Sequence, residues 1–214
     1  MDNRIENNKV QITGEVVTDF TFDHELYGER FYGCFIDVPR TSGTSDQIVV
    51  MVSERMVDIS ADRIGSWITV TGQLRTYNFQ EGGRNRMRIH VFAQEVEVFD
   101  PLSKIIPSYD DNRVILNGYL CKKPTYRKTP LGREIADLIL AVNRPYGKSD
   151  YIPCICWGRN ARYVDSLDVG TCLTLEGRIQ SREYMKKLED GSEELRTAYE
   201  VSVSIVREPE LEER

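Results

Sequence analysis

The chain repeats itself at a constant spacing of 104 residues. Gly14 matches Gly118 and Arg40 matches Arg144, and the register holds without a gap until one residue is inserted ahead of residue 170. From there a spacing of 105 aligns residues 65–74 with residues 170–179. Because so many glycines and apolar residues coincide at one spacing, the sequence indicates two copies of a single domain.

The repeat sets the domain boundaries. We predict domain 1 at residues 1–100 and domain 2 at residues 112–207, each near the usual size of a small domain. The segment 101–111 between them contains two prolines and is predicted to be a linker. Residues 208–214 are predicted to form a short acidic tail.

Apolar residues recur with a period of two in each copy, which is typical of half-buried β-strands. We predict five strands per copy, the first of which opens the copy (Val10 to Val16 in domain 1). In domain 1 the other strands are predicted at residues 31–38, 48–52, 68–74 and 86–98. In domain 2 they are predicted at residues 134–142, 151–157, 173–179 and 198–206. Between the third and fourth strands, residues 54–64 and 158–167 lack this alternation and have helical spacing, so one short helix per copy is predicted.

The order of three strands, a helix and two strands predicts an all-β fold. It is the order of the oligonucleotide/oligosaccharide-binding (OB) fold, a five-stranded Greek-key barrel that presents one face and its loops to ligands. The chain is thus predicted to contain two tandem OB barrels. Gly14, Gly72, Gly118 and Gly177 lie in mid-strand, where glycine usually marks a sharp bend or a bulge, so we assign them to barrel closure.

Charge is distributed unevenly between the copies. The net charge is −6, which for a whole chain argues against a nucleic-acid partner. Residues 8–100 carry 9 Lys and Arg against 14 Asp and Glu, whereas residues 112–207 carry 16 against 12. Domain 2 is therefore the candidate for binding an anionic partner.

Several classes of protein are disfavoured by missing patterns. No apolar run is long enough for a membrane-spanning helix and the amino end is polar, so we expect a soluble protein of the cytoplasm with no membrane contact. With two histidines and no C-x-x-C motif, we expect no metal and no cofactor. No phosphate loop or nucleophile-base pair is present, so we expect no enzyme. A nuclease would need clustered carboxylates together with arginines, and only Glu15, Asp37 and Arg40 could form such a group.

Domain 2 resembles a known family. Residues 112–120 (Asn-Arg-Val-Ile-Leu-Asn-Gly-Tyr-Leu), the Trp157-Gly-Arg sequence and residues 175–179 (Leu-Glu-Gly-Arg-Ile) are similar to the bacterial single-stranded DNA-binding protein (SSB) family, and domain 1 resembles it more faintly. The resemblance implies sequence-independent binding of single-stranded DNA in replication, recombination or repair, at the nucleoid. It further implies a homodimer with four barrels and replication or repair proteins as partners.

The resemblance also assigns binding residues in domain 2. Bases would stack on Tyr146, Tyr151, Trp157 and Tyr184. Phosphates would be contacted by Arg113, Lys122, Lys123, Arg127, Lys128, Arg144, Lys148, Arg159, Lys186 and Lys187. Aromatic faces and cations are the features needed to bind strands of any sequence, because every nucleotide has a base face and a phosphate.

Domain 1 departs from this pattern. Ser53 stands where Trp157 does and Gln47 where Tyr151 does, so that only Tyr77 and Phe79 remain as stacking candidates. Arg84, Arg86 and Arg88 follow one another at a spacing of two, which on a strand places them on one face and predicts a basic stripe.

Each assignment has a plainer alternative. Tyr151 and Tyr184 are equally well explained as half-buried packing residues. The basic residues Lys122, Lys123, Arg127 and Lys128 are explained by a solvated loop, and the domain 1 arginines by protection of an edge strand. The alternative function is a structural or protein-interaction module in a replication or mobile-element complex.

Overall fold

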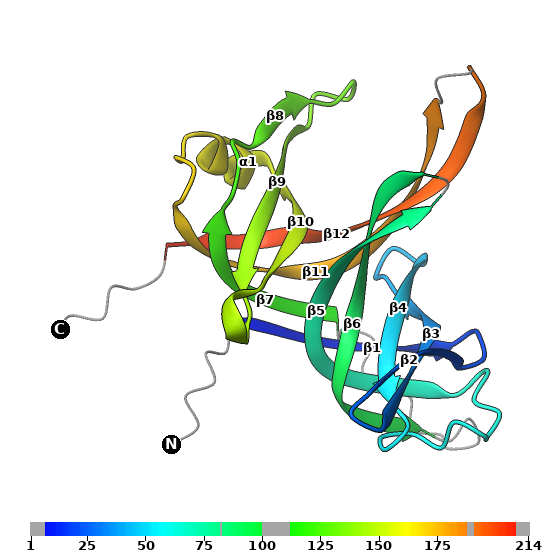
Figure 1. The fold of residues 1–214 in the computed structure, drawn as a ribbon. Coiled ribbons are helices and arrows are strands. Elements are labelled where there is room, and N and C mark those ends of the chain that lie inside the picture. Colours follow the sequence, from blue (N-terminus) through cyan, green and yellow to red (C-terminus); the bar gives the residue numbers. More distant parts are fainter. Residues whose placement is uncertain (1–6, 82, 100–111, 188–190, 209–214) are drawn as a thin grey trace.

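The computed structural model describes residues 7–81, 83–99, 112–187 and 191–208, and these form two barrels joined in one 12-stranded sheet (Figure 1). Barrel 1 consists of β1 (Asn8–Val16), β2 (Thr21–Leu26), β3 (Glu29–Pro39), β4 (Ser45–Ser53), β5 (Trp67–Glu81) and β6 (Arg84–Phe99). Barrel 2 consists of β7 (Asn112–Leu120), β8 (Thr125–Lys128), β9 (Glu134–Asn143), the 3-10 turn η1 (Pro145–Gly147), β10 (Ser149–Trp157), α1 (Gly158–Asp165), β11 (Cys172–Lys187) and β12 (Glu193–Arg207). The predicted linker and the tail beyond residue 208 lie outside these residues.

Each barrel closes as an OB fold, which confirms the predicted fold class. In barrel 1 the first strand pairs with both β5 and β3, and β4 meets β6 in parallel. Barrel 2 repeats this arrangement, with β7 pairing with β11 and β9, and β10 meeting β12 in parallel. The short strands β2 and β8, which the sequence did not predict, extend β3 and β9 as hairpins.

The mid-strand glycines lie where the barrels close, as predicted. A Cβ on Gly14 would lie 2.6 Å from the carbonyl oxygen of Asp37, and one on Gly118 would lie 2.5 Å from that of Ala141. The ladder between β5 and β6 has a bulge at Gly72, and the ladder between β11 and β12 has one at Gly177. Glycine is needed at these four positions because another strand's backbone occupies the space of a side chain.

The prediction of one helix per copy is wrong for domain 1. Residues 158–165 form α1, which packs Ala161 and Val164 inward, but residues 54–66 of barrel 1 form turns. The amides of Ser60 and Ile64 donate to the carboxylates of Asp58 and Asp62, each two residues earlier, at 3.1 Å. Such local bonds compete with helix formation, which explains the difference between the copies.

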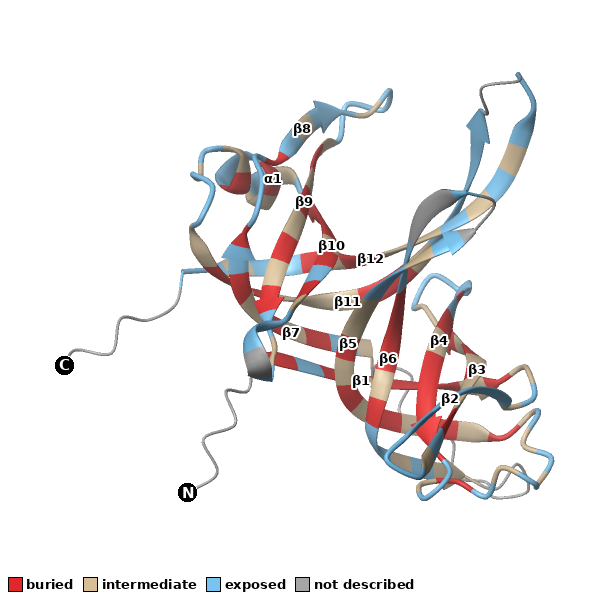
Figure 2. Cartoon of the chain, in the orientation of Figure 1, coloured by how far each residue is buried: buried red, intermediate tan, exposed pale blue. Residues whose placement is uncertain are grey.

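The two barrels are joined through their first strands. β1 and β7 run antiparallel, with Val10 opposite Val114, so that one sheet continues from β6 through β5, β1, β7 and β11 to β12. Buried side chains fill both barrels, whereas most of the described residues in the outer halves of the β5–β6 and β11–β12 hairpins are exposed (Figure 2). Each of these long hairpins contacts the other barrel, β5 against β10 and β11 against β4.

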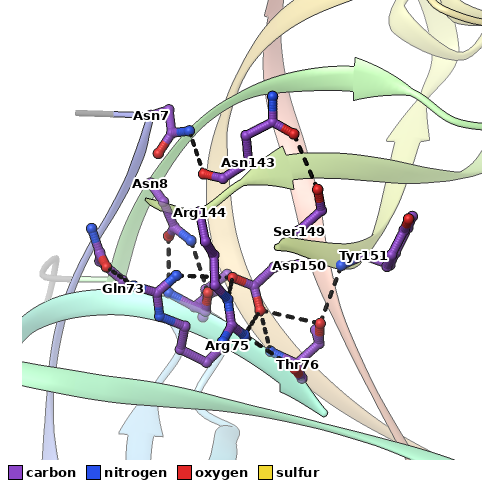
Figure 3. A network of polar contacts seen from close by, with 11 residues as sticks. Asn7, Asn8, Gln73, Arg75, Thr76, Asn143, Arg144, Ser149, Asp150 and Tyr151 are labelled. Carbon is purple, nitrogen blue, oxygen red and sulfur yellow. Dashed lines mark hydrogen bonds and ion pairs between the residues drawn. The ribbon is translucent and has the colours of Figure 1, made fainter. Parts of the chain in front are cut away.

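Buried aspartates fix both contacts. Asp150 of β10 accepts hydrogen bonds from the Thr76 amide at 2.6 Å, from Arg75 Nη1 at 2.9 Å and from Arg144 (Figure 3). Asp46 of β4 accepts from the Ser181 amide at 2.7 Å and from Arg40 Nε at 2.6 Å. Burial alone would raise the pKa of Asp150, but the hydrogen bonds from Arg144, Thr76 and Arg75 outweigh it and lower the pKa, so the carboxylate stays charged.

Within the described ranges, no helix is long and apolar enough to cross a membrane. Those same residues contain no group of three or more potential metal ligands.

Candidate nucleic-acid interface

The outer face of β10 carries two of the predicted aromatics. Tyr151 is 50% exposed and Trp157 38% exposed. They are six residues apart, so they lie on the same face of the strand with about 20 Å between them. The indole Nε1 of Trp157 donates to Ser202 Oγ of β12 at 3.1 Å, which fixes the ring while one side remains open to solvent.

Strand β11 continues this face. Arg178 lies opposite Ser202 in the β11–β12 ladder, and Arg182 and Tyr184 follow on the same side at even spacings. The Arg182 guanidinium carbon lies 5.7 Å from the centre of the Tyr184 ring. The structure therefore brings three predicted aromatics, Tyr151, Trp157 and Tyr184, to one face of barrel 2.

A cavity of about 410 Å³ beside Trp157 is rich in arginine. Its arginines are Arg133, Arg178, Arg182 and, from barrel 1, Arg40. The sequence analysis missed all four. Alternation along residues 178–186 carried a signal for Arg178 and Arg182, whereas only the folded chain brings Arg40 across from the other barrel.

The predicted phosphate-binding residues of domain 2 fall into two groups. One group is exposed and has no ion pair in the described structure: Lys122, Lys128, Lys148, Arg159, Lys186 and Lys187. In the other group, Arg127 pairs with Asp137 at 2.9 Å, Arg113 lies 3.4 Å from Glu176, and Lys123 Nζ donates to the carbonyl of Asp165 at the end of α1 at 2.7 Å. Arg144, bound to Asp150, serves the contact between the barrels. Phosphate contacts by all of these stay predictions.

The candidates in domain 1 gather on the β5–β6 hairpin. The rings of Tyr77 and Phe79 lie 5.8 Å apart, and the Arg88 guanidinium carbon is 5.1 Å from the Phe79 ring centre. This hairpin meets the β11–β12 hairpin at a cavity of about 430 Å³, where Phe79 and Arg88 face Tyr184 and Tyr199. The side chains of Arg84, Arg86 and Tyr146 lie outside the described part of the structure.

Barrel 1 has no aromatic on β4 but has others nearby. Ser53, at the position of Trp157, is buried and donates to the Glu29 carboxylate, and Gln47, at the position of Tyr151, is exposed. Phe92 of β6 occupies the ladder position that Ser202 has in barrel 2. The Phe92 ring lies 5.5 Å from the ring of Phe31, which stacks on His24 at 4.8 Å. Barrel 1 therefore has aromatic rings on β3 and β6, the two strands that flank β4.

Two OB barrels sharing one sheet, with aromatic rings and arginines along one face, define the chain as a tandem OB-fold protein. Residues 111–208 match the model of the single-strand binding protein family. The chain is 40% identical over 80 residues to single-stranded DNA-binding proteins of Halalkalibacterium halodurans and Bacillus subtilis, which covers 34% of this chain and 48% and 46% of theirs. These matches all show that the second barrel is similar to the single-strand binding protein family.

The likeness of the fold extends over both barrels. The wild-type single-stranded DNA binding protein from Thermus aquaticus superposes with a TM-score of 0.72 at 20% sequence identity, covering 94% of this chain and 92% of that chain. At 20% sequence identity, this likeness shows that the two proteins share a fold and nothing further. The chain spans about half the length of the curated relatives that it matches.

Proposed function

We propose that this protein binds single-stranded DNA without sequence preference, in replication, recombination or repair. The observation that carries the proposal is the cavity beside Trp157, where one partly exposed indole lies among four arginines. The ring offers a surface on which any base can stack. The arginines other than Arg40, whose guanidinium is bound to Asp46, can neutralise phosphates. The names of the relatives support the same ligand. We infer a binding protein and not an enzyme, acting at the nucleoid.

A homodimer with four barrels, which the family resemblance implies, is the assembly that we infer. Sedimentation or light scattering tests this, since a mass of one chain excludes the dimer. Replication or repair proteins are the partners we expect. A role as a protein-interaction module alone is not favoured, because it does not explain a partly exposed tryptophan among arginines.

The test is a titration of tryptophan fluorescence with thymidine homopolymer, repeated at several salt concentrations and with duplex DNA. A Trp67→Phe variant isolates the signal of Trp157, because the chain has two tryptophans. We expect strong quenching, preference for the single strand and a steep salt dependence. Trp157→Ala should weaken binding about 5- to 150-fold, the equivalent of about 1–3 kcal/mol for one stacked base.

Two results contradict the proposal. One is the absence of binding to thymidine homopolymer at low salt. The other is unchanged affinity of Trp157→Ala, with Trp157→Phe as the matched variant that keeps an aromatic face.

A further inference from the structure

We propose that barrel 1 holds a separate site that takes one unpaired nucleobase of the bound strand and contacts it through His90. The proposal rests on the proposed function, since the base belongs to the single strand. Its cavity corresponds by the repeat to the arginine-lined cavity beside Trp157. The ligand of the barrel 1 cavity is a neutral base, whereas the arginine-lined cavity is suited to the phosphate backbone.

The cavity has the size of a small-molecule site. Its volume is about 670 Å³, within the range of about 300–1,000 Å³ that is usual for bound small molecules. Apolar and aromatic walls come from Met51, Tyr77 and Phe92. The ring of His24, stacked on Phe31, lines it as well. Rings of this kind bind the faces of bases.

His90 is the unexplained group in this cavity. Its side chain is buried, with the residue only 7% exposed, and its Nδ1 has no hydrogen-bond partner. Buried polar atoms almost always have a partner, so an unpaired ring nitrogen in a residue that lines a cavity points to a ligand that supplies one. The Tyr77 ring, which also lines the cavity, approaches the imidazole edge-on, with ring centres 6.0 Å apart.

The chemistry of His90 fits a base edge. Burial lowers the pKa of His90 to about 4, so the ring is neutral at pH 7. A neutral imidazole offers one N–H donor and one acceptor nitrogen, as the hydrogen-bonding edges of bases do.

The charges around the cavity favour a neutral ligand over a phosphate. Arg75 and Arg144 reach the cavity, but both are bound to the buried Asp150. The carboxylate of Asp23, which lines the cavity, lies 2.7 Å from His24 Nδ1. Two cations are therefore matched by two carboxylates, whereas a phosphate site needs an excess of positive charge.

At the corresponding place in barrel 2, which lines the cavity beside Trp157, the two facing side chains bind each other. Gln180 lies opposite Glu200 in the β11–β12 ladder, as Arg75 lies opposite His90 in the β5–β6 ladder. Gln180 Nε2 donates to Glu200 Oε1 at 2.8 Å, so the pair satisfies itself. In barrel 1, Arg75 turns to Asp150 instead and leaves His90 unpaired.

The chain offers a direct probe of this cavity, because its only two histidines, His24 and His90, both line it. We would label the full chain on histidine, add thymidine homopolymer, and record imidazole signals by NMR together with Trp157 fluorescence. We expect the His90 signal to shift as Trp157 is quenched. Quenching with both histidine signals unmoved would overturn the base site and leave the proposed function intact. Absence of both changes would overturn the proposed function itself.

Variants of His90 test the hydrogen bond. His90→Phe keeps an aromatic ring but loses the nitrogens, and we expect it to weaken binding about two- to tenfold, as the loss of one hydrogen bond does. His90→Gln restores a donor and an acceptor and should recover part of the loss. Lys9→Ala, on an exposed residue of β1, is the control and should bind as the parent does. Equal affinity of His90→Phe and the parent overturns the proposal.

Discussion

Asp46 and Asp150, which lie 104 residues apart, perform the same task from opposite barrels. Each is buried near the start of its strand, binds an arginine six residues earlier, and accepts a hydrogen bond from a backbone amide of the other barrel's long hairpin. The repeat in the sequence has thus become an approximate two-fold relation in space. The two hairpin contacts between the barrels are therefore two copies of one polar arrangement, beside the pairing of β1 with β7.

Removing one of these carboxylates should loosen the hairpin that it holds. We expect Asp150→Ala to lower the free energy of unfolding by about 3–5 kcal/mol, because Arg75, Arg144 and the Thr76 amide lose their common partner. Urea unfolding measures the effect. Asp137→Ala is the control, since its pair with Arg127 is largely exposed and should contribute less than about 1 kcal/mol. Similar losses in the two variants would contradict this account.

The barrel-closing glycines give a second prediction. Gly14→Ala should destabilise the protein by about 2–3 kcal/mol, because its Cβ would overlap the carbonyl of Asp37 and force β1 and β3 apart. Gly33→Ala is the matched control in β3, where the nearest atom to a new Cβ is Met51 Cε at 3.9 Å. We expect little change for Gly33→Ala in thermal unfolding. If both glycines tolerate alanine equally, the close approach at Gly14 does not constrain the fold.

The arginines beside Trp157 should set the salt dependence of DNA binding. Replacing Arg178 and Arg182 by Gln should reduce the slope of log affinity against log salt by about 1.4, at about 0.7 for each phosphate contact to a single strand. Titrations at several salt concentrations measure the slope. Arg207→Gln is the control, because Arg207 pairs with Glu176 at 2.9 Å and does not line that cavity. An unchanged slope in the double variant would remove these arginines from the interface.

His90 should make the protein less stable in acid. Burial lowers its pKa from 6.5 to about 4, with smaller contributions from Asp23, Arg144, Asp150 and Arg88. Between these values the unfolded chain binds a proton that the folded chain does not, so the free energy of unfolding falls as the pH falls from about 6.5 to about 4. The loss is at most about 3 kcal/mol, at 1.36 kcal/mol per pKa unit. The His90→Phe variant should lack this part of the decline. If the free energy of unfolding falls equally with pH in the variant and in the parent, the buried neutral His90 does not cause the acid sensitivity.

Much of this protein was determined by its sequence alone. The spacing of 104 residues and the alternation of apolar residues predicted two OB barrels. A period of two gives each strand one face to bury, and a repeated sequence is expected to form the same fold in each copy. The mid-strand glycines were assigned to barrel closure for the same local reason. Tyr151 and Trp157 could be predicted to share a face, since they lie an even number of residues apart on one strand.

Only the tertiary structure decided which side chains of one barrel reach the other barrel. Arg40 reaches the cavity beside Trp157, and Arg144 binds the buried Asp150 and reaches the cavity around His90, although the sequence favoured a phosphate contact for Arg144. Local patterns say which face of a strand a side chain lies on, but not which strand of another domain it meets. That depends on the pairing of β1 with β7 and on how far each hairpin reaches, and both arise only when the two cores pack together.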